Sequence, residues 1–284
     1  MPAQVIDGHA LANRIREDVG MRAARLRRGG KIVRLDAVLV TGDPAGEIYA
    51  SKQASSCKEL GIEYVLHRIR HEATYEEIAG RVLLLNADEG VSAIMVHLPL
   101  PAGIEPERIQ SLIDPEKDVE GVNPANIGRV VYGRRSLVPC TALAVMEMIE
   151  STGITLRGSR CVCVGASNIV GKPVAILLMQ AEATVVSTNK YTKDLAAETR
   201  AAEVLISAAG VPGLVKRAMV KPGAVVIDVG ISRAKGADGK THTVGDVAFE
   251  EVKEVAGWMS PVPGGVGPVT VATMLANVVE AAER

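Results

Sequence analysis

Aromatic residues are nearly missing from this chain of 284 residues, which has one Trp, one Phe and five Tyr. Proteins that bind single-stranded nucleic acids stack the bases on aromatic side chains, so this scarcity argues against that class. An excess of positive charge, which marks nucleic-acid and membrane-surface binding, is also missing, because 32 Lys and Arg balance 33 Asp and Glu. The composition therefore predicts neither a nucleic-acid nor a membrane partner.

A long apolar run is missing too. No stretch of about 18 apolar residues occurs, as a membrane-spanning helix would need. The first eight residues do not place basic residues ahead of an apolar stretch, as a secretory signal would. The cysteines have neither disulfide nor metal-site spacing; they are Cys57, Cys140, Cys161 and Cys163. We therefore expect a reduced, cytoplasmic protein without a metal.

Apolar segments rich in Val, Ile and Ala alternate with helical patterns along almost the whole chain. Such segments are typical of parallel strands that are covered on both sheet faces. The expected strands are 34–41, 62–70, 93–98, 160–165, 184–187, 204–208 and 224–229. The sequence therefore predicts the α/β class with parallel sheets, in a chain long enough for two domains.

Residues 160–173 have the pattern of a strand, a tight turn and the start of a helix. Gly165 permits the turn, and the amide groups that begin a helix can bind a pyrophosphate. Compared with the G-x-G-x-x-G motif, Ser167 replaces the middle glycine and Gly171 comes one residue late. The local pattern fits a dinucleotide site or a structural turn.

Lys190 follows the next expected strand, where an NAD-selective site carries an acidic residue. Residues 187–192 contain no acidic residue, and a lysine can pair with the 2′-phosphate of NADP. The sequence therefore predicts NADP over NAD. The alternative is a solvated loop lysine.

Residues 261–268 contain three prolines and three glycines, just before an apolar helix expected over Val269–Ala282. Proline fixes the backbone, and glycine lets it come close to a ligand. We expect a rigid loop that shapes one wall of a site, with a plain connector as the alternative. A surface hairpin is expected over Arg233–Thr243.

Two of these segments resemble signatures of the bifunctional methylenetetrahydrofolate dehydrogenase/methenyltetrahydrofolate cyclohydrolase family. Residues 165–173 are similar to its cofactor loop, G-R/A-S-x-I-V-G-x-P. Residues 260–270 are similar to its signature T-P-V-P-G-G-V-G-P-M-T, with Ser260 for Thr and Val269 for Met. The resemblance covers essentially the whole chain and implies NADP, a reduced folate substrate and a homodimer.

The resemblance also implies the architecture. An N-terminal three-layer α/β catalytic domain is expected over residues 1–139 plus 268–284, and a Rossmann-like NADP-binding domain over 140–267, with a cleft between them. The implied cofactor-binding residues are Gly165, Ala166, Ser167, Ile169, Val170, Asn189, Lys190, Ala209, Gly210, Ile231, Gly264, Gly265 and Thr270. The implied substrate-binding residues are Tyr49, Leu98, Pro99, Glu120, Pro263, Gly264 and Gly265.

The catalytic positions depart from the family pattern. In the family's Y-x-x-x-K motif the tyrosine stacks on the folate and the lysine serves the cyclohydrolase step; here Tyr49 is followed by Gln53. Lys52 stands one position early, which on a helix is a rotation of about 100°. A local π-bulge could bring it back. Glutamine forms hydrogen bonds but does not titrate.

Two further positions differ. His97 stands where the family has Gln in V-Q-L-P-L-P, and Glu120 stands for the second Asp of K-D-V-D-G. In the family the Gln supports the lysine and the Asp contacts the pterin. His97 could act as a base or be a satisfied histidine at a strand end. Glu120 could instead be a capping or surface carboxylate.

We therefore expect an NADP-dependent methylenetetrahydrofolate dehydrogenase with weakened or absent cyclohydrolase activity. The candidate catalytic residues are Tyr49, Gln53, Lys52, His97 and Glu120. The first alternative is the full bifunctional enzyme. Others are a dehydrogenase for another one-carbon carrier and a non-catalytic nucleotide-binding paralogue.

Overall fold

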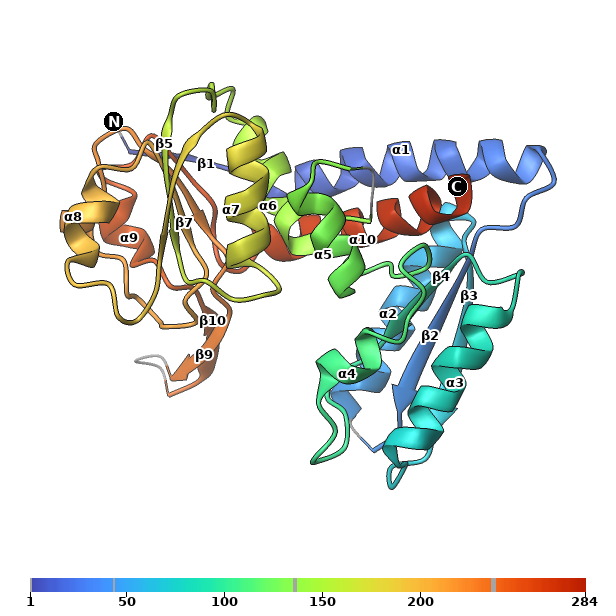
Figure 1. Ribbon diagram of the computed structural model, residues 1–284. Helices are drawn as coiled ribbons and strands as arrows, with labels where there is room; N and C mark the ends of the chain where they lie inside the picture. Colours follow the sequence, from blue (N-terminus) through green and yellow to red (C-terminus); the bar gives the residue numbers. More distant parts are fainter. Residues whose placement is uncertain (1, 43, 135–136, 236–238) are drawn as a thin grey trace. The chain divides into compact units, whose positions relative to one another are not determined.

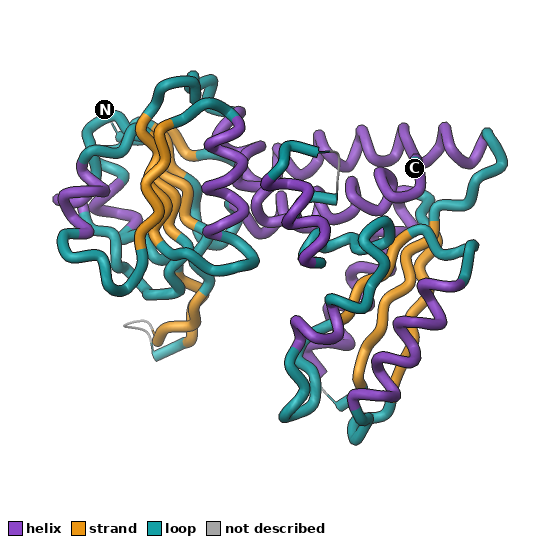
Figure 2. Tube along the Cα trace, in the orientation of Figure 1, coloured by secondary structure: helices purple, strands orange, loops and turns teal. Residues whose placement is uncertain are grey.

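The structure is a computed structural model that describes residues 2–42, 44–134, 137–235 and 239–284. It divides into two compact units, residues 1–13 with 141–273 and residues 14–140 with 274–284. Each unit contains its own parallel β-sheet with helices against it (Figures 1 and 2). The unit boundaries fall within three helices, α1 (Gly8–Arg28), α6 (Cys140–Glu150) and α10 (Val266–Glu283).

The sheet of the first unit has six strands in the order β1-β11-β8-β7-β5-β6, all paired in parallel. The strands are β1 (Gln4–Val5), β5 (Arg160–Val164), β6 (Thr184–Thr188), β7 (Val204–Ser207), β8 (Val225–Asp228) and β11 (Trp258–Met259). Their apolar sequences are buried, as the continuous apolar runs predict. The loops after the carboxyl ends of β5, β7 and β8 carry most of the predicted cofactor residues.

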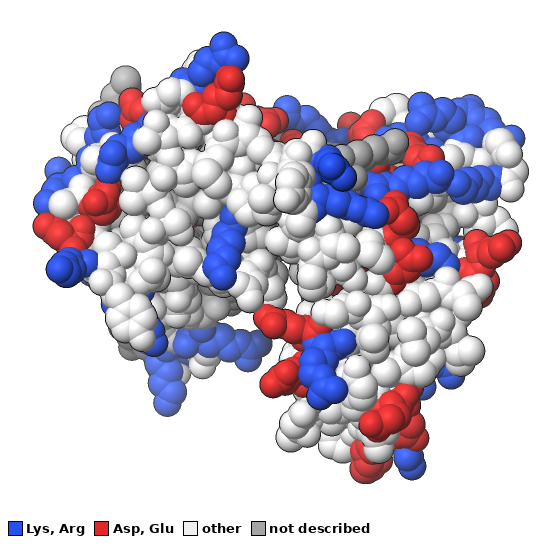
Figure 3. All heavy atoms as spheres, viewed as in Figure 1, with Lys and Arg blue, Asp and Glu red and all other residues white. Residues whose placement is uncertain are grey.

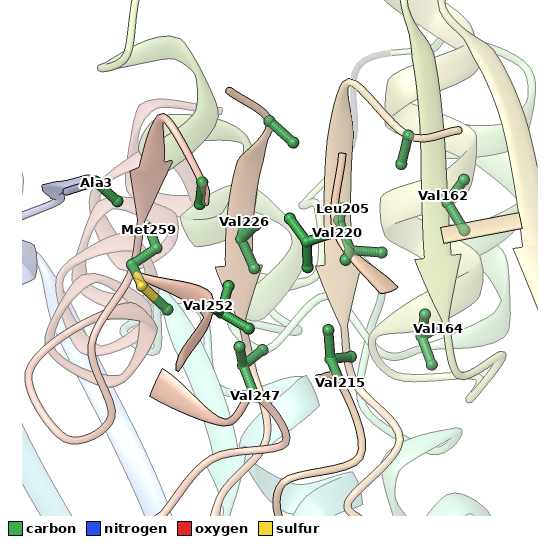
Figure 4. Close-up of a cluster of buried hydrophobic side chains, with 13 residues drawn as sticks. Ala3, Val162, Val164, Leu205, Val215, Val220, Val226, Val247, Val252 and Met259 are labelled. Atoms are coloured by element: carbon green, nitrogen blue, oxygen red, sulfur yellow. The ribbon is translucent and has the colours of Figure 1, made fainter. Parts of the chain in front are cut away.

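Helices cover both faces of this sheet (Figure 1). On one side lies α7 (Gly171–Gln180), which packs on β5 and β6, and on the other lie α8 (Leu195–Arg200) and α9 (Phe249–Val252). Figure 4 shows the core on the α9 side, where Leu205, Val226 and Val252 meet. The unit also includes α6 (Cys140–Glu150) from Thr141 on, and a short 3-10 helix, Arg217–Met219.

The second unit has a three-stranded parallel sheet in the order β3-β2-β4. Its strands are β2 (Arg34–Val40), β3 (Glu63–Ile69) and β4 (Ala93–Val96), and its helices are α2 (Pro44–Leu60), α3 (Tyr75–Ala87), α4 (Pro106–Gln110) and α5 (Pro124–Val131). Helices α2 and α3 lie on opposite faces of the sheet (Figure 1). Thr74 and Glu77 start α3 with a capping box. Because side chains alternate along a strand, one set of β2 residues faces α3 and the other set faces α2. Val38 and Val40 belong to the apolar cluster on the α3 side.

The predicted α/β class with two parallel sheets is confirmed, and all seven expected strands are present. The hairpin is confirmed as β9 (Ser232–Lys235) paired with β10 (Thr241–Val244), although Gly236 and Asp238 lie outside the described residues. The predicted start of the last helix was wrong. Helix α10 begins at Val266 because Pro268, expected in the loop, is compatible with a first helical turn.

The domain boundaries near Pro139 and residue 268 stay a prediction. Residues 4–5 of the chain pair with β11, so the structure groups the N-terminal segment with the sheet of the first unit.

Figure 3 shows Lys and Arg interspersed with Asp and Glu on the visible face of both units. Within the described ranges, no helix has the length and apolar character of a membrane span.

Candidate functional site

The turn after β5 is closed by two glycines that leave no space for a side chain. Gly165 has a φ of +103°, and a Cβ there would overlap the carbonyl oxygen of Ala208. A Cβ on Gly171, the first residue of α7, would overlap the carbonyl oxygen of Gly165. The backbone therefore crosses itself closely between the strand and the helix, which forms the kind of cradle that a pyrophosphate needs.

The Ser167 side chain forms hydrogen bonds within this turn. Its Oγ accepts hydrogen bonds from the amides of Val170 and Gly171 at 3.2 and 3.4 Å. Two amides at the start of α7 are therefore already hydrogen-bonded within the protein. Ser167 fixes their orientation, and they are not free donors for a ligand at this turn. Ile169, also predicted to bind the cofactor, is exposed.

The loop after β6 presents Lys190 on a fixed turn. The amide of Asn189 donates to Thr192 Oγ1 at 3.0 Å, and Asn189 Oδ1 accepts from the amide of Tyr191 at 2.9 Å. Lys190 is exposed, with its Nζ 5.0 Å from the centre of the Tyr191 ring. These bonds hold the backbone while the ammonium group remains accessible to an anion.

The proline- and glycine-rich segment forms a pocket of about 110 Å³ together with the end of β8. Gly264 has a φ of +98°, and a Cβ on Gly265 would overlap the carbonyl oxygen of Pro261. A Cβ on Gly8 would in turn overlap the carbonyl oxygens of Gly264 and Gly265. The backbone of this wall is therefore closely packed, and Ile231 lies at the same pocket. Thr270 follows in α10, partly buried.

Two aspartates behind these loops were not singled out from the sequence. Asp246 is fully buried, and its Oδ2 accepts hydrogen bonds from Ser207 Oγ and from the amides of Ala209 and Gly210. Asp228 is buried as well, and burial raises the pKa of its carboxyl to about 6. No local pattern identifies such a pair, because the partners come from segments far apart in the sequence.

Helix α2 separates Gln53 from Lys52. The buried stripe of this helix consists of Gly46, Ala50, Gln53 and Cys57. Lys52 is exposed, as a rotation of about 100° per residue predicts. The structure therefore brings Gln53, and not Lys52, to the inner face of the helix.

The Gln53 carboxamide lies in a sulfur-rich environment within the second unit. Its Nε2 is 2.9 Å from Met95 Sδ and 3.8 Å from Met274 Sδ. Its Oε1 is buried with no hydrogen-bond partner among the described residues. A buried acceptor of this kind is costly, which marks the position as one that packing alone does not explain.

His97 follows β4 and is buried against two tyrosines. Its Nε2 lies 3.2 Å from the hydroxyl of Tyr64, and its ring meets the Tyr49 ring edge-on, with centroids 5.7 Å apart. Burial lowers the pKa of His97, and the nearby Glu47 carboxylate raises it less. These contacts favour a neutral, satisfied histidine that orients Tyr49.

Glu120 is close enough to Tyr49 that its charge raises the pKa of the tyrosine, after the larger effect of burial. The pKa of Glu120 itself is raised to about 7, mainly by burial and then by the nearby Asp118, while a hydrogen bond from the Gln110 side chain acts to lower it. Its Oε2 is buried without a partner among the described residues. This is not a solvated surface carboxylate, because one oxygen is held inside the protein and left without a donor.

The predicted residues thus form one group in each unit. In the second unit Tyr49, His97 and Glu120 lie together, with Gln53 one turn along α2 from Tyr49. Leu98 is half-exposed after β4, and the Leu98–Pro99 peptide bond is cis, as is Val262–Pro263 in the first unit. No cluster of metal-binding side chains is found in the part of the chain that the structure describes.

The chain matches two family profiles. Residues 6–120 match "Tetrahydrofolate dehydrogenase/cyclohydrolase, catalytic domain", and residues 139–284 match its "NAD(P)-binding domain". A curated relative, "Bifunctional protein FolD" of Bordetella petrii, is 48% identical over 282 residues, which cover 99% of this chain and 95% of that protein.

Solved structures are similar over the full length. The bifunctional methylenetetrahydrofolate dehydrogenase/cyclohydrolase of Campylobacter jejuni has a TM-score of 0.93 and 39% identity, covering 99% of both chains. The Trypanosoma brucei enzyme, solved with NADP cofactor and an inhibitor, has a TM-score of 0.92 and 35% identity, covering 100% of this chain and 98% of that chain.

Proposed function

Because the chain belongs to the tetrahydrofolate dehydrogenase/cyclohydrolase family, we propose that it oxidises 5,10-methylenetetrahydrofolate with NADP and hydrolyses the methenyl product to 10-formyltetrahydrofolate. The observation that carries the oxidation is the glycine cradle of Gly165 and Gly171 at the end of β5. The support for both activities together comes from full-length relatives named as bifunctional.

The residues of the first unit fit a dinucleotide. The cradle would hold the pyrophosphate, Lys190 would pair with the 2′-phosphate, and the pocket at Ile231 and Gly264 would take the nicotinamide end. When bound, NADP supplies the hydride acceptor. The protein's own contribution to this step is alignment, and proximity can supply about 7–11 kcal/mol to a reaction between two bound molecules.

Tyr49 and Glu120 support the folate side of the proposal. Tyr49 is half-exposed, so its ring is available for stacking, and the edge of the His97 ring fixes its orientation. The unpartnered Oε2 of Glu120 can accept an N–H bond from a pterin ring. The two side chains are thus suited to bind a flat heterocycle that carries hydrogen-bond donors.

Hydrolysis needs a group that moves protons near neutral pH. Gln53 cannot titrate, and Lys52 lies on the exposed face of α2. Glu120, with a pKa of about 7, has the required range and lies beside Tyr49. We therefore assign the proton transfer of the hydrolytic step to Glu120, with His97 as the neutral neighbour that orients the tyrosine.

A second candidate function is a dehydrogenase with weakened or lost cyclohydrolase activity. The observation in its favour is that an amide, Gln53, occupies the buried position where the family motif has a lysine. The comparisons favour the bifunctional proposal over it, since the similar full-length proteins are described by both activities.

The test uses one purified sample and two assays, NADP reduction with 5,10-methylenetetrahydrofolate and decay of the methenyl compound. The proposal expects catalysis in both, above the spontaneous rates. Oxidation without catalysed decay would favour the second candidate. Failure of both would favour another one-carbon carrier or a non-catalytic nucleotide-binding protein.

The homodimer and the cytoplasmic location remain predictions from the sequence.

Gln53→Lys separates the two candidates further. The variant places an ammonium group between Met95 and Met274, so we expect the free energy of unfolding to fall by about 3 kcal/mol. If Glu120 serves hydrolysis, the rate of methenyl decay should not rise. A tenfold increase would instead show that the wild-type site lacks a base. Lys52→Ala is the matched control and should change neither quantity, because Lys52 is exposed.

Lys190→Ala is expected to raise the KM for NADP by about 10- to 100-fold, because a charge-assisted bond to the 2′-phosphate is lost. The KM for NAD should not change. Steady-state kinetics with both nucleotides measures the ratio, and Lys221→Ala, which removes a lysine paired with Glu203, is the control. An unchanged NADP to NAD preference would show that Lys190 is only a solvated loop residue.

A further inference from the structure

The loop after β7 has almost no side chains of its own to hold it in place. It consists of Ala208, Ala209 and Gly210, and Gly210 has a φ of +69°. Such a segment has a high conformational entropy when free, so its shape must be imposed by other residues. The same segment carries two of the predicted cofactor-binding positions.

Asp246 imposes that shape with one carboxylate oxygen. Its Oδ2 accepts the amide of Ala209 at 2.7 Å, the amide of Gly210 at 3.1 Å and the hydroxyl of Ser207 at 3.2 Å. Asp246 and Ser207 are buried, Ala209 is partly buried and Gly210 is exposed, so the carboxylate reaches from the interior to the surface end of the loop. A single side chain therefore fixes the end of β7 and the two residues that follow it.

Asp228 holds Asp246 in turn. Asp228 Oδ1 accepts the amides of Asp246 at 3.0 Å and of Gly230 at 2.9 Å, and its Oδ2 accepts the amide of Val247 at 2.9 Å. The end of β8 and the segment 246–247 are thus tied to the same carboxylate. Two carboxylates connect the loops after two neighbouring strands of the sheet.

Two glycines pack directly against the pair. A Cβ on Gly230 would overlap Asp246 Oδ1, and a Cβ on Gly245 would overlap Asp228 Oδ2. Asp246 Oδ1 is itself buried without a hydrogen-bond partner among the described residues. Burying a carboxylate oxygen without a hydrogen-bond donor lowers the stability of the fold, so we expect Asp246 to have a role other than stabilising it.

We infer that Asp246, supported by Asp228, is a positioning residue that holds the loops after β7 and β8 in the shape that binds the dinucleotide. The inference rests on the proposed NADP-dependent function, and Asp246 lies outside the motifs that carry the family resemblance in the sequence analysis. It assigns no chemistry to the carboxylate, whose lone pairs at Oδ2 are directed to the loop amides rather than to a ligand.

The test compares NADP binding by the wild type with that of Asp246→Asn and Ser207→Ala, by titration calorimetry. Asp246→Asn is expected to weaken binding about tenfold or more, because the amide replaces a charged acceptor of three hydrogen bonds. Ser207→Ala removes one of the three and should weaken binding about threefold. The KM for the folate substrate should stay unchanged in both variants.

Glu203→Gln is the matched control. Glu203 accepts the amide of Arg160 at the opposite ends of the same strands, so its loss tests a carboxylate that holds backbone far from the loops. This variant should change stability without changing NADP affinity. A merely structural Asp246 would behave in the same way.

Two failures are distinguishable. If the wild type binds no NADP, the proposed function fails and the inference fails with it. If the wild type binds NADP and both the Asp246→Asn and Ser207→Ala proteins bind it equally well, only the inference is overturned. Faster hydrogen exchange at the amides of Ala209 and Gly210 in Asp246→Asn, but not in Glu203→Gln, is the accompanying result that we expect.

Discussion

Gly171→Ala is expected to abolish measurable NADP-dependent turnover and to lower the free energy of unfolding by about 3 kcal/mol. The added Cβ would overlap the carbonyl oxygen of Gly165, and neither atom belongs to a flexible side chain that could move away. Overpacking in a well-packed site costs about 1–3 kcal/mol, and a backbone clash belongs at the upper end. Relief requires the turn to open, which destroys the cradle.

The measurement combines chemical denaturation with NADP titration. Gly80→Ala is the matched control, because Gly80 lies within α3 and a Cβ there meets nothing within 4 Å. The control should gain about 0.5–1 kcal/mol of stability and keep its NADP affinity. Unchanged NADP affinity in a folded Gly171→Ala protein would contradict the assignment of this turn to the pyrophosphate.

Glu120→Gln is expected to lower kcat/KM for the folate substrate by about 100-fold at pH 8 and to make it independent of pH. The ionised carboxylate accepts hydrogen bonds that an uncharged amide replaces only in part, at a cost of about 1.5–3 kcal/mol. In the wild type the carboxyl has a pKa of about 7, so kcat/KM should fall about tenfold per pH unit below that value.

The free energy of unfolding should rise in Glu120→Gln at pH 8, whereas kcat/KM falls. The pKa of Glu120 is about 7 in the folded chain against an ordinary value of 4.5, so protonation favours the folded state. The stability that this carboxyl contributes is complete below pH 4.5 and is lost as the pH rises through 7, by at most about 3 kcal/mol. Glu120→Gln should therefore be more stable than the wild type at pH 8 and less active.

Glu116→Gln is the control for the lower kcat/KM and the higher stability that we expect of Glu120→Gln. Glu116 is paired with Arg129 and Arg284, which hold the pKa of its carboxyl below the ordinary value. Its replacement should reduce stability above that pKa and leave kcat/KM unchanged. Loss of both activity and stability in Glu120→Gln would contradict the account, because it would indicate that the carboxylate only supports the fold.

The strands and their parallel class were predictable because both sheets are buried on two faces, which leaves continuous apolar runs in the sequence. The two-residue strands β1 and β11 were not predicted. Their existence depends on pairing with each other and with β8, a contact across about 250 residues that no local pattern encodes. The start of α10 was missed because prolines and glycines before a helix also fit its first turn.

At the candidate site the sequence was informative where the backbone itself forms the surface. Gly165 and Gly264 were identified, and both have a positive φ that favours glycine; Gly171 stood out in the sequence only as a departure from the G-x-G-x-x-G spacing. The opposite faces of Gln53 and Lys52 followed from helical rotation. The role of Asp246 could not be predicted. Its partners Ser207, Ala209 and Gly210 precede it by more than 35 residues, and their proximity is a product of the sheet order.

The central claim is tested most directly by following NADP reduction in a mixture of the purified wild-type chain, NADP and 5,10-methylenetetrahydrofolate. The account predicts a rate that is proportional to protein concentration, lower with NAD at equal concentration, and absent in Gly171→Ala. NADP reduction no faster than in the protein-free mixture, from a folded sample that binds NADP, would contradict it.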